Sequence, residues 1–241
     1  MNIERYGKGP KTLFIHGAGG STLTWFFQRT GLKEAGEIIL VDLPGHGTSP
    51  EEGLDSIETF GQAIFGAIGE DGDGYVVVGH SMGGAIAMTM ALQSPRSVRG
   101  LVLIGTGARL RVFPDILTGI QKDMGSTVKN IIDYAFSPKS PDWIREMGLN
   151  AYMKNNPSVV FKDFLACDRF DITGRLRELT MPILIICGTD DRLTPPKYSE
   201  FLHREMPSSE LCFVEDGGHM VMIEKPDIVN GHLRNFLERL P

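Results

Sequence analysis

Six short apolar segments recur along this chain, and each runs into a glycine-containing turn. In order they read TLFIHG, EIILVDLPGHG, YVVVGHSMGG, VRGLVLIGTG, PILIICGTDD and ELCFVEDGGH. Their apolar residues are continuous rather than alternating, which is typical of strands that are buried on both faces of a parallel sheet. Because helical stretches separate several of these segments, the sequence predicts an α/β fold with a mostly parallel sheet flanked by helices.

The alternation of predicted strands and helices is interrupted once, between residues 107 and 179. This stretch holds helix-like pieces separated by Pro114, Pro138, Pro141 and Pro157. A structureless loop of that length is implausible inside a compact domain. We therefore expect residues 1–106 and 180–241 to form one core, and residues 107–179 to form a helical lid inserted before the fifth predicted strand.

Composition narrows the classes of function. The 241 residues fit one larger α/β domain, and a net charge of −6 gives no reason to expect a nucleic-acid partner. No apolar run approaches the roughly 20 residues that span a bilayer, and the opening MNIERYGKGPK lacks the apolar stretch of a secretory signal, so we expect a cytoplasmic protein without a membrane partner. Neither the three cysteines nor the histidines show metal-ligand spacing, and no metal or cofactor is expected. The oligomeric state is left open.

The turn that follows the third segment carries one serine among glycines. Gly79, Gly83 and Gly84 remove the Cβ atoms around Ser81, so the backbone can turn sharply and present the hydroxyl at the tip. Two interpretations compete at this point: Ser81 is a nucleophile, or it merely caps the following helix. Cys167 is another candidate nucleophile, but no glycine turn or neighbouring histidine accompanies it.

Reactive side chains follow other predicted strands, at the edge of the sheet where α/β proteins bind ligands. After Ser81 come the adjacent pair Asp190 and Asp191, and then His219 in a glycine-rich turn. A serine hydroxyl becomes a useful nucleophile when an imidazole takes its proton, and a carboxylate fixes the tautomer of that imidazole. Either aspartate is placed to reach the histidine.

The segments LFIHGAGGS, ILVDLPGHGTS, VVVGHSMGGAIA, PILIICGTDDRLTPP and EDGGHMVMIEKPDIVN resemble successive motifs of the α/β-hydrolase superfamily, particularly its small serine esterases, lactonases and cofactor-free haloperoxidase-like members. The resemblance covers nearly the whole chain outside the lid. It implies a nucleophile at Ser81 and a base at His219, and its spacing from Gly188 favours Asp191 as the acid. The short N-terminal segment leaves room for only about one strand before the first core strand, so we expect a shortened sheet edge.

Attack on a carbonyl requires donors for the oxyanion that forms. We expect these donors to be the backbone N–H groups of Met82 and Ala18, with Gly19 next in the glycine-rich loop and close to the substrate. His16 is expected to hold the backbone of that loop, and His80 to point away from the site. HGAGGS lacks the lysine ending of a phosphate-binding loop.

The function that the sequence supports is hydrolysis of a small or medium carboxylic ester through an acyl-enzyme. Lactone, thioester or carbon–carbon bond hydrolysis stays open, as does a member of the fold that only binds a ligand. The apolar lid, including Phe113 and Phe161, is expected to select small-molecule ester substrates by acyl size. Arg109 and Arg111 are the basic pair that a charged acyl group would need instead.

Overall fold

The computed structural model describes residues 1–69 and 72–240, and it contains one seven-stranded sheet in the order β1-β3-β2-β4-β5-β6-β7. The strands are β1 (Asn2–Tyr6), β2 (Lys11–Ile15), β3 (Glu37–Asp42), β4 (Tyr75–His80), β5 (Val98–Ile104), β6 (Ile183–Gly188) and β7 (Ser209–Val214). All neighbouring pairs are parallel except β1 and β3. The predicted α/β class, with its six apolar strands, is confirmed.

The first edge of the sheet is short, as expected from the N-terminal sequence. A single strand, β1, precedes β2, and it pairs antiparallel with β3 from Asn2 opposite Asp42 to Tyr6 opposite Ile38. Every residue of β4 and β6 is buried, because these central strands are covered on both faces. The turns that leave their carboxyl ends are therefore held on a rigid base.

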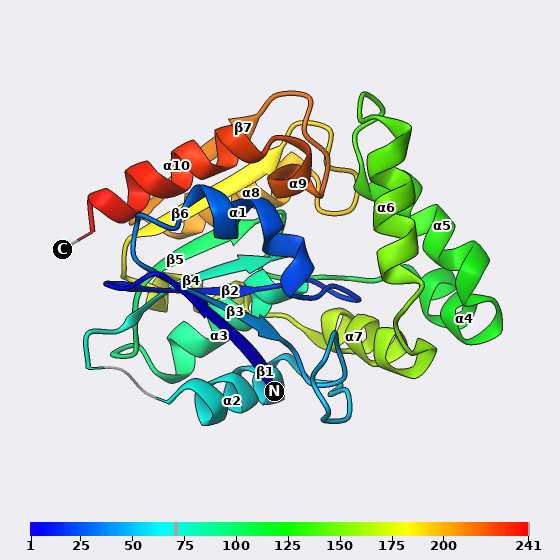
Figure 1. Ribbon diagram of the computed structural model, residues 1–241, viewed down its shortest axis with the longest axis horizontal. Helices are drawn as coiled ribbons and strands as arrows, with labels where there is room; N and C mark the ends of the chain where they lie inside the picture. Colours follow the sequence, from blue (N-terminus) through cyan, green and yellow to red (C-terminus); the bar gives the residue numbers. More distant parts are fainter. Residues whose placement is uncertain (70–71, 241) are drawn as a thin grey trace.

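Helices cover both faces of the sheet (Figure 1). On one face lie α2 (Ile57–Ile68), α3 (Met82–Gln93) and α8 (Pro196–Glu205), whose apolar side chains share one core with alternate strand residues. On the other face lie the 3₁₀ helix η1 (Thr22–Trp25), α1 (Phe26–Gly31), α9 (Val221–Glu224) and α10 (Pro226–Glu238). Two apolar layers thus sandwich the strands.

Residues 107–179 form the helical insertion between β5 and β6. It contains α4 (Pro114–Lys122), α5 (Met124–Ala135), α6 (Asp142–Tyr152), α7 (Pro157–Arg169) and the 3₁₀ helix η2 (Thr173–Glu178). Within this fully described stretch the only β pairing is an isolated bridge between Arg109 and Asp171. In Figure 1, α4, α5 and α6 stand to one side of the sheet, and α7 returns towards it.

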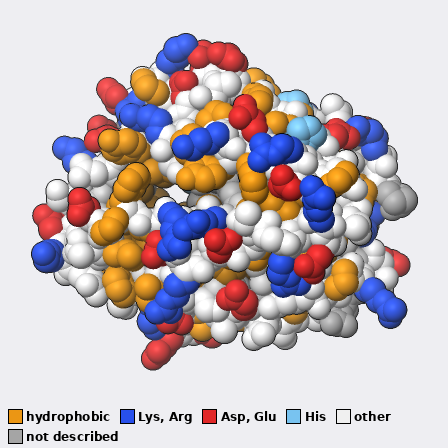
Figure 2. Space-filling view, turned by 180° about the vertical axis from the view of Figure 1, so that it is seen from behind, with side chains coloured by type: hydrophobic (Ala, Val, Ile, Leu, Met, Phe, Trp, Pro, Cys, Tyr) orange, Lys and Arg blue, Asp and Glu red, His pale blue; other side chains and the backbone are white. Residues whose placement is uncertain are grey.

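The insertion has a small apolar core of its own, formed by Val128, Ile132, Ala135, Phe136 and Ile144. Figure 2 shows a hollow bordered by hydrophobic side chains, on the side of the molecule where the insertion lies. None of the helices in residues 1–69 and 72–240 combines the length and the apolar character that crossing a bilayer requires.

Candidate active site

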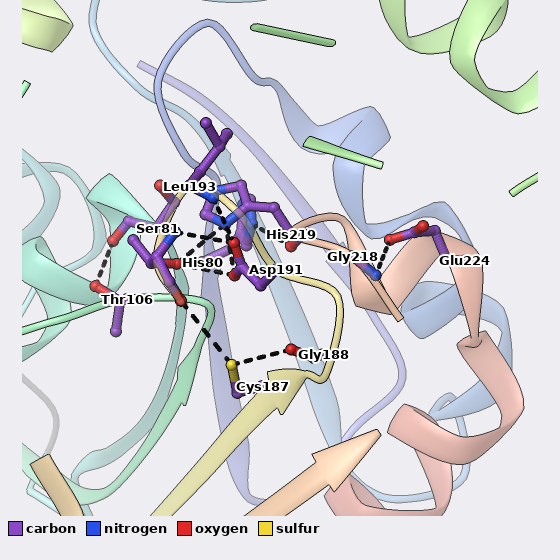
Figure 3. Close-up of polar contacts among 11 residues, drawn as sticks. His80, Ser81, Thr106, Cys187, Gly188, Asp191, Leu193, Gly218, His219 and Glu224 are labelled. Carbon is purple, nitrogen blue, oxygen red and sulfur yellow. Dashed lines mark hydrogen bonds and ion pairs between the residues drawn. The ribbon is translucent and has the colours of Figure 1, made fainter. Parts of the chain in front are cut away.

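Ser81 occupies a strained turn between β4 and α3. Its φ of 53° and ψ of −117° lie where side chains rarely occur. The strain persists because neighbouring groups fix the turn: the Ser81 amide donates to the carbonyl of Ile104 at 3.0 Å, and the Thr106 hydroxyl donates to the carbonyl of Ser81 at 2.8 Å. The surrounding structure therefore holds this serine in one orientation (Figure 3).

Glycines make the turn sterically feasible. A Cβ atom on Gly83 would lie 2.2 Å from the carbonyl oxygen of Ile15, and one on Gly79 would lie 2.2 Å from the carbonyl oxygen of Gly83. Both clashes are with backbone atoms, which cannot move aside. The close contact of α3 with β2 and β4 therefore depends on these glycines, as the sequence indicates.

The interpretation of Ser81 as a helix cap is wrong. Ser81 is the N-cap residue of α3, but its side chain makes no capping hydrogen bond. An N-cap serine normally accepts a hydrogen bond from an amide of the first helical turn, so its hydroxyl here is free for another role.

His219 and Asp191 meet at the carboxyl edge of the sheet. Nδ1 of His219 lies 2.9 Å from Oδ2 of Asp191, and the two residues are 5% and 3% exposed. Asp191 follows β6 and His219 follows β7, so adjacent parallel strands bring them together. The Thr194 hydroxyl donates to Oδ2 of Asp191 at 2.9 Å, and its oxygen lies 3.1 Å from Nδ1 of His219.

The second oxygen of Asp191 is also satisfied. Oδ1 accepts hydrogen bonds of 2.9 Å from the amides of Leu193 and Thr194. Burial opposes ionisation of this carboxyl, but the contact with His219 and the bonds from Thr194 outweigh it, and the pKa of Asp191 is lowered. Asp191 is therefore a carboxylate that holds the His219 ring through Nδ1 and does not contact its Nε2.

Asp190 points elsewhere. Its Oδ2 accepts a hydrogen bond of 2.6 Å from the hydroxyl of Ser137, which lies between α5 and α6. Arg192, two residues further along the chain, donates to the carbonyls of Asp133 and Phe136. The geometry thus separates the two neighbouring aspartates, and only Asp191 contacts the histidine.

The prediction that His80 points away from the site is wrong. Its ring packs against that of His219, with 4.6 Å between the ring centroids, and its Nε2 donates to the carbonyl of His219 at 3.0 Å. Burial, followed by the proximity of His219, holds the pKa of His80 well below its usual value. A neutral His80 supports the backbone of His219 without adding a charge beside it.

Glu224 braces the same turn from α9. Its Oε2 accepts from the amide of Gly218 at 2.8 Å, and its Oε1 accepts from the amide of Ser137 at 2.8 Å. A Cβ atom on Gly218 would lie 2.4 Å from the nitrogen of Ser137. The turn that carries His219 is therefore packed directly against the insertion, and sequence reasoning missed this contact.

The loop after β2 lies beside Ser81. A Cβ atom on Gly17 would lie 3.1 Å from the Cβ of Ser81. The amides of Ala18 and Met82 have no acceptor within residues 1–69 and 72–240, whereas the amide of Gly19 donates to Asp163 at 2.9 Å. Gly19 is therefore committed to another contact, and Ala18 and Met82 keep the N–H groups that an oxyanion would need.

His16 holds this loop, as expected. Its Nε2 accepts from the amide of Leu43 at 3.1 Å, so its Nδ1 carries the proton and donates to the carbonyl of Gly17 at 2.8 Å. Burial first, and the neighbouring His46 second, lower the pKa of His16 to about 3. His16 is thus a neutral structural imidazole.

Sequence reasoning missed Asp163 and the role of His46. Asp163 lies on the buried face of α7, and its Oδ2 is 2.7 Å from Nε2 of His46. The available signal was a carboxylate within the apolar stripe of that helix, which also contains Val160 and Cys167. Cys167 is buried, and burial raises the pKa of its thiol, so the thiolate required of a nucleophile is disfavoured.

The two phenylalanines assigned to substrate binding differ in exposure. Phe113 immediately precedes α4 and is 79% exposed, whereas Phe161 in α7 is half-buried. Arg109 and Arg111 pair with Asp171 at 3.5 Å and Asp168 at 3.9 Å, so each already has a carboxylate partner. In the part of the chain that the structure describes, no group of three or more potential ligands is arranged to hold a metal ion.

Known proteins resemble this chain in sequence and in structure. A sequence pattern described as "Alpha/beta hydrolase family" matches residues 12–231. A pimeloyl-(acyl-carrier protein) methyl ester esterase from Neisseria meningitidis is 26% identical, over 95% of this chain and 93% of its own. A putative carbamate hydrolase, RutD, from Agrobacterium fabrum is 27% identical over 98% of both chains.

A solved structure described as a thermophilic esterase superposes with a TM-score of 0.85 and 34% identity, over 99% of this chain and 98% of the other. The similarity extends through the insertion as well as the core. These relatives and the structural neighbour are hydrolases or esterases by description.

Proposed function

Because this chain belongs to the α/β-hydrolase family, whose pattern covers residues 12–231, we propose that it is a serine hydrolase that cleaves small to medium carboxylic esters through an acyl-enzyme intermediate. The observation that carries the proposal is the buried contact of 2.9 Å between His219 and Asp191, next to a strained serine whose hydroxyl caps no helix. Esterases among the relatives support the same chemistry.

The first half of the reaction forms a bond between Oγ of Ser81 and the ester carbonyl carbon. Nε2 of His219 takes the hydroxyl proton as that bond forms, and Asp191 stabilises the resulting imidazolium. The carbonyl oxygen gains the negative charge and accepts hydrogen bonds that the amides of Ala18 and Met82 donate. Met82 is the first residue of α3, so the helix dipole adds to the stabilisation.

Collapse of this intermediate breaks the bond to the alcohol. His219 returns its proton to the leaving alkoxide, and the acyl group stays on Ser81. A water molecule then adds to the acyl carbon while His219 takes one of its protons. The bond between the acyl carbon and Oγ of Ser81 breaks, His219 gives that proton to Oγ, and the carboxylic acid is released. The cycle consumes one water and requires no cofactor or metal.

A serine at position 81 does not separate linear esters from lactones, thioesters or carbamates, since all of them acylate a serine. The described relatives include a methyl ester esterase and a putative carbamate hydrolase. The apolar core of the insertion and the carboxylate partners of Arg109 and Arg111 support an uncharged acyl group. We favour carboxylic esters because esterases are among the similar proteins.

Active-site labelling with a fluorophosphonate, followed by peptide mapping, tests the proposal. We expect stoichiometric modification of Ser81 and loss of p-nitrophenyl butyrate hydrolysis with the same time course. The Ser81→Ala variant is the matched control, because it keeps a side chain at the strained position while removing the nucleophile. A protein that binds ligands without labelling, or a Ser81→Ala variant with full activity, would contradict the proposal.

A further inference from the structure

Asp163 places a carboxylate of the insertion directly on the glycine-rich loop beside Ser81. It lies in α7 and is fully buried, with 0% exposure. Its Oδ2 accepts two hydrogen bonds, from the Gly19 amide at 2.9 Å and from Nε2 of His46 at 2.7 Å. These three residues come from the insertion, the loop after β2 and the turn after β3, so one carboxylate joins three separate parts of the chain.

The hydrogen-bond geometry assigns a charge to His46. Its Nε2 faces the Asp163 carboxylate, and its Nδ1 faces the carbonyl of Pro44 at 3.1 Å. Both partners are acceptors, so both ring nitrogens donate, which describes an imidazolium. Burial opposes that charge, but Asp163 outweighs it and raises the pKa of His46. His16, 5.0 Å away between ring centroids, is neutral because Nε2 accepts a bond.

Hydrogen bonds hold each peptide group around Gly19. The Gly17 carbonyl, which shares a peptide group with the Ala18 amide, accepts from the Gly20 amide at 3.0 Å and from His16. The next peptide group donates its Gly19 amide to Asp163. The Gly19 carbonyl accepts from the Asn155 side chain at 2.8 Å. Since N–H and C=O point in opposite directions in a trans peptide, the direction of the Ala18 amide is set by these partners.

Steric contact completes the arrangement. Gly19 has a φ of 63°, and a Cβ atom there would lie 2.3 Å from Cζ of Tyr152. The ring of Tyr152, at the end of α6, therefore packs onto the bare Cα of Gly19. Asn155 and Tyr152 belong to the insertion, like Asp163, so the insertion contacts Gly19 with a carboxylate, an amide and an aromatic ring.

We propose that Asp163 is a positioning residue for the oxyanion hole: through Gly19 it fixes the loop so that the Ala18 amide faces the oxyanion formed at Ser81, and the His46 imidazolium balances its charge. This role rests on the proposed serine-hydrolase function. It makes the insertion part of the catalytic machinery rather than only a cover over it. Burying a carboxylate requires a large desolvation free energy, and apolar side chains of similar volume would stabilise the fold at least as well.

The test compares Asp163→Ala and Asp163→Asn in the full-length protein, with kcat expressed per active site titrated by fluorophosphonate. Losing one oxyanion donor costs about 10²–10³ in kcat, and a misdirected donor loses a part of this, so we expect a fall of about 10- to 100-fold in Asp163→Ala. KM should change by less than about threefold, because a donor to the oxyanion acts mainly in the transition state. Asn keeps an oxygen acceptor for Gly19 and should recover most of the lost kcat.

The matched control is Asp168→Asn, on the same helix. Asp168 accepts from the amide of Val112 at 3.1 Å and contacts neither Gly19 nor His46, so kcat should stay within about twofold. If Asp163→Ala does not fold, Asn155→Ala replaces it, since that change removes the other polar contact to Gly19 from a partly exposed site. It should lower kcat with little change in KM.

A spectroscopic measurement checks the charge without using activity. In the unmodified protein, ¹⁵N NMR should show both ring nitrogens of His46 protonated at neutral pH, and Asp163→Asn should abolish this state. A neutral His46 would overturn the charge assignment. Variants of Asp163 that lower the melting temperature but leave kcat per titrated site unchanged would overturn the positioning role. If the unmodified protein neither labels at Ser81 nor hydrolyses esters, the proposed function fails instead.

Discussion

Asp190 and Asp191 are adjacent in the chain, yet their carboxylates serve different parts of the molecule. Oδ2 of Asp191 lies 2.9 Å from Nδ1 of His219, whereas Oδ2 of Asp190 accepts from the hydroxyl of Ser137 at 2.6 Å. The first contact joins two strand ends of the core, and the second joins the core to the insertion. Substitutions at the two positions should therefore have different consequences.

Asp191→Asn should lower kcat by roughly 10⁴-fold, because an amide favours the wrong tautomer of the histidine and does not stabilise its charged form. Asp190→Asn should change kcat by less than about threefold, since an amide oxygen still accepts the bond from Ser137. Steady-state hydrolysis of p-nitrophenyl butyrate measures both. The reverse ranking would transfer the role of acid to Asp190.

A second prediction concerns the glycines of the serine turn. Gly83→Ala places a Cβ atom 2.2 Å from the carbonyl oxygen of Ile15, so we expect a loss of several kcal/mol of unfolding free energy, or no folded protein. Gly66→Ala is the control. It lies exposed in α2 with nothing within 4 Å of the added atom, and it should raise the unfolding free energy by about 0.5–1 kcal/mol. Urea denaturation compares them; equal effects would show that the close approach at Gly83 is not needed.

A third prediction concerns stability below neutral pH. The pKa of His16 is lowered to about 3 in the folded protein, so between its ordinary value of about 6.5 and this value only the unfolded chain binds the proton. The free energy of unfolding that depends on a neutral His16 is therefore fully present above about pH 6.5. It decreases as the pH falls below that value, by up to about 1.4 kcal/mol per pH unit. His80, whose pKa is also lowered, acts in the same direction.

His46 acts in the opposite direction near neutral pH, because its raised pKa lets the folded protein bind the proton before the unfolded chain does; well below about pH 6.5 it is protonated in both states and does not affect the slope. His16→Gln retains a donor and an acceptor but does not titrate. It should reduce the dependence of the unfolding free energy on pH by the contribution of one histidine. Urea unfolding at several pH values from 7 to 4.5 measures it. An unchanged slope in His16→Gln would mean that His16 takes up its proton in the folded protein as well.

The core of this fold is predictable from the sequence because its signals are local. Each buried strand is a continuous apolar run, and each reactive side chain follows one, so the edge where Ser81, Asp191 and His219 gather follows from the parallel arrangement. The turn at Ser81 is recognisable from its glycines, since a Cβ atom at these positions would clash with backbone atoms. These features need no knowledge of distant contacts.

The contacts made by the insertion are not predictable in this way. Asp163 and Gly19 are 144 positions apart, and Asp163 and His46 are 117 apart, so no local pattern pairs them. His80 shows the same limit: its position beside Ser81 suggested a side chain pointing away, but the packing of the final turn brings His219 onto its ring. Long-range packing decides such side chains.

The last prediction concerns acyl-chain length. If the substrate binds in an apolar site beneath the insertion, as we propose, each added methylene of the acyl chain should contribute about 0.8 kcal/mol, roughly fourfold in kcat/KM, until the space is filled. We expect kcat/KM for p-nitrophenyl esters to climb from acetate to butyrate or hexanoate and then to fall. Phe161→Ala, at a half-buried position in α7, should move the optimum to longer chains.

Phe113→Ala is the control for this series. Phe113 is 79% exposed, so its removal should leave the optimum where it is, against the sequence-based expectation that it contacts substrate. A shift of the optimum in Phe113→Ala would show that this side chain folds inward when substrate binds. A preference for a dicarboxylate half-ester that disappears in Arg109→Ala would show that the insertion recognises charge, which requires Arg109 to leave its partner Asp171.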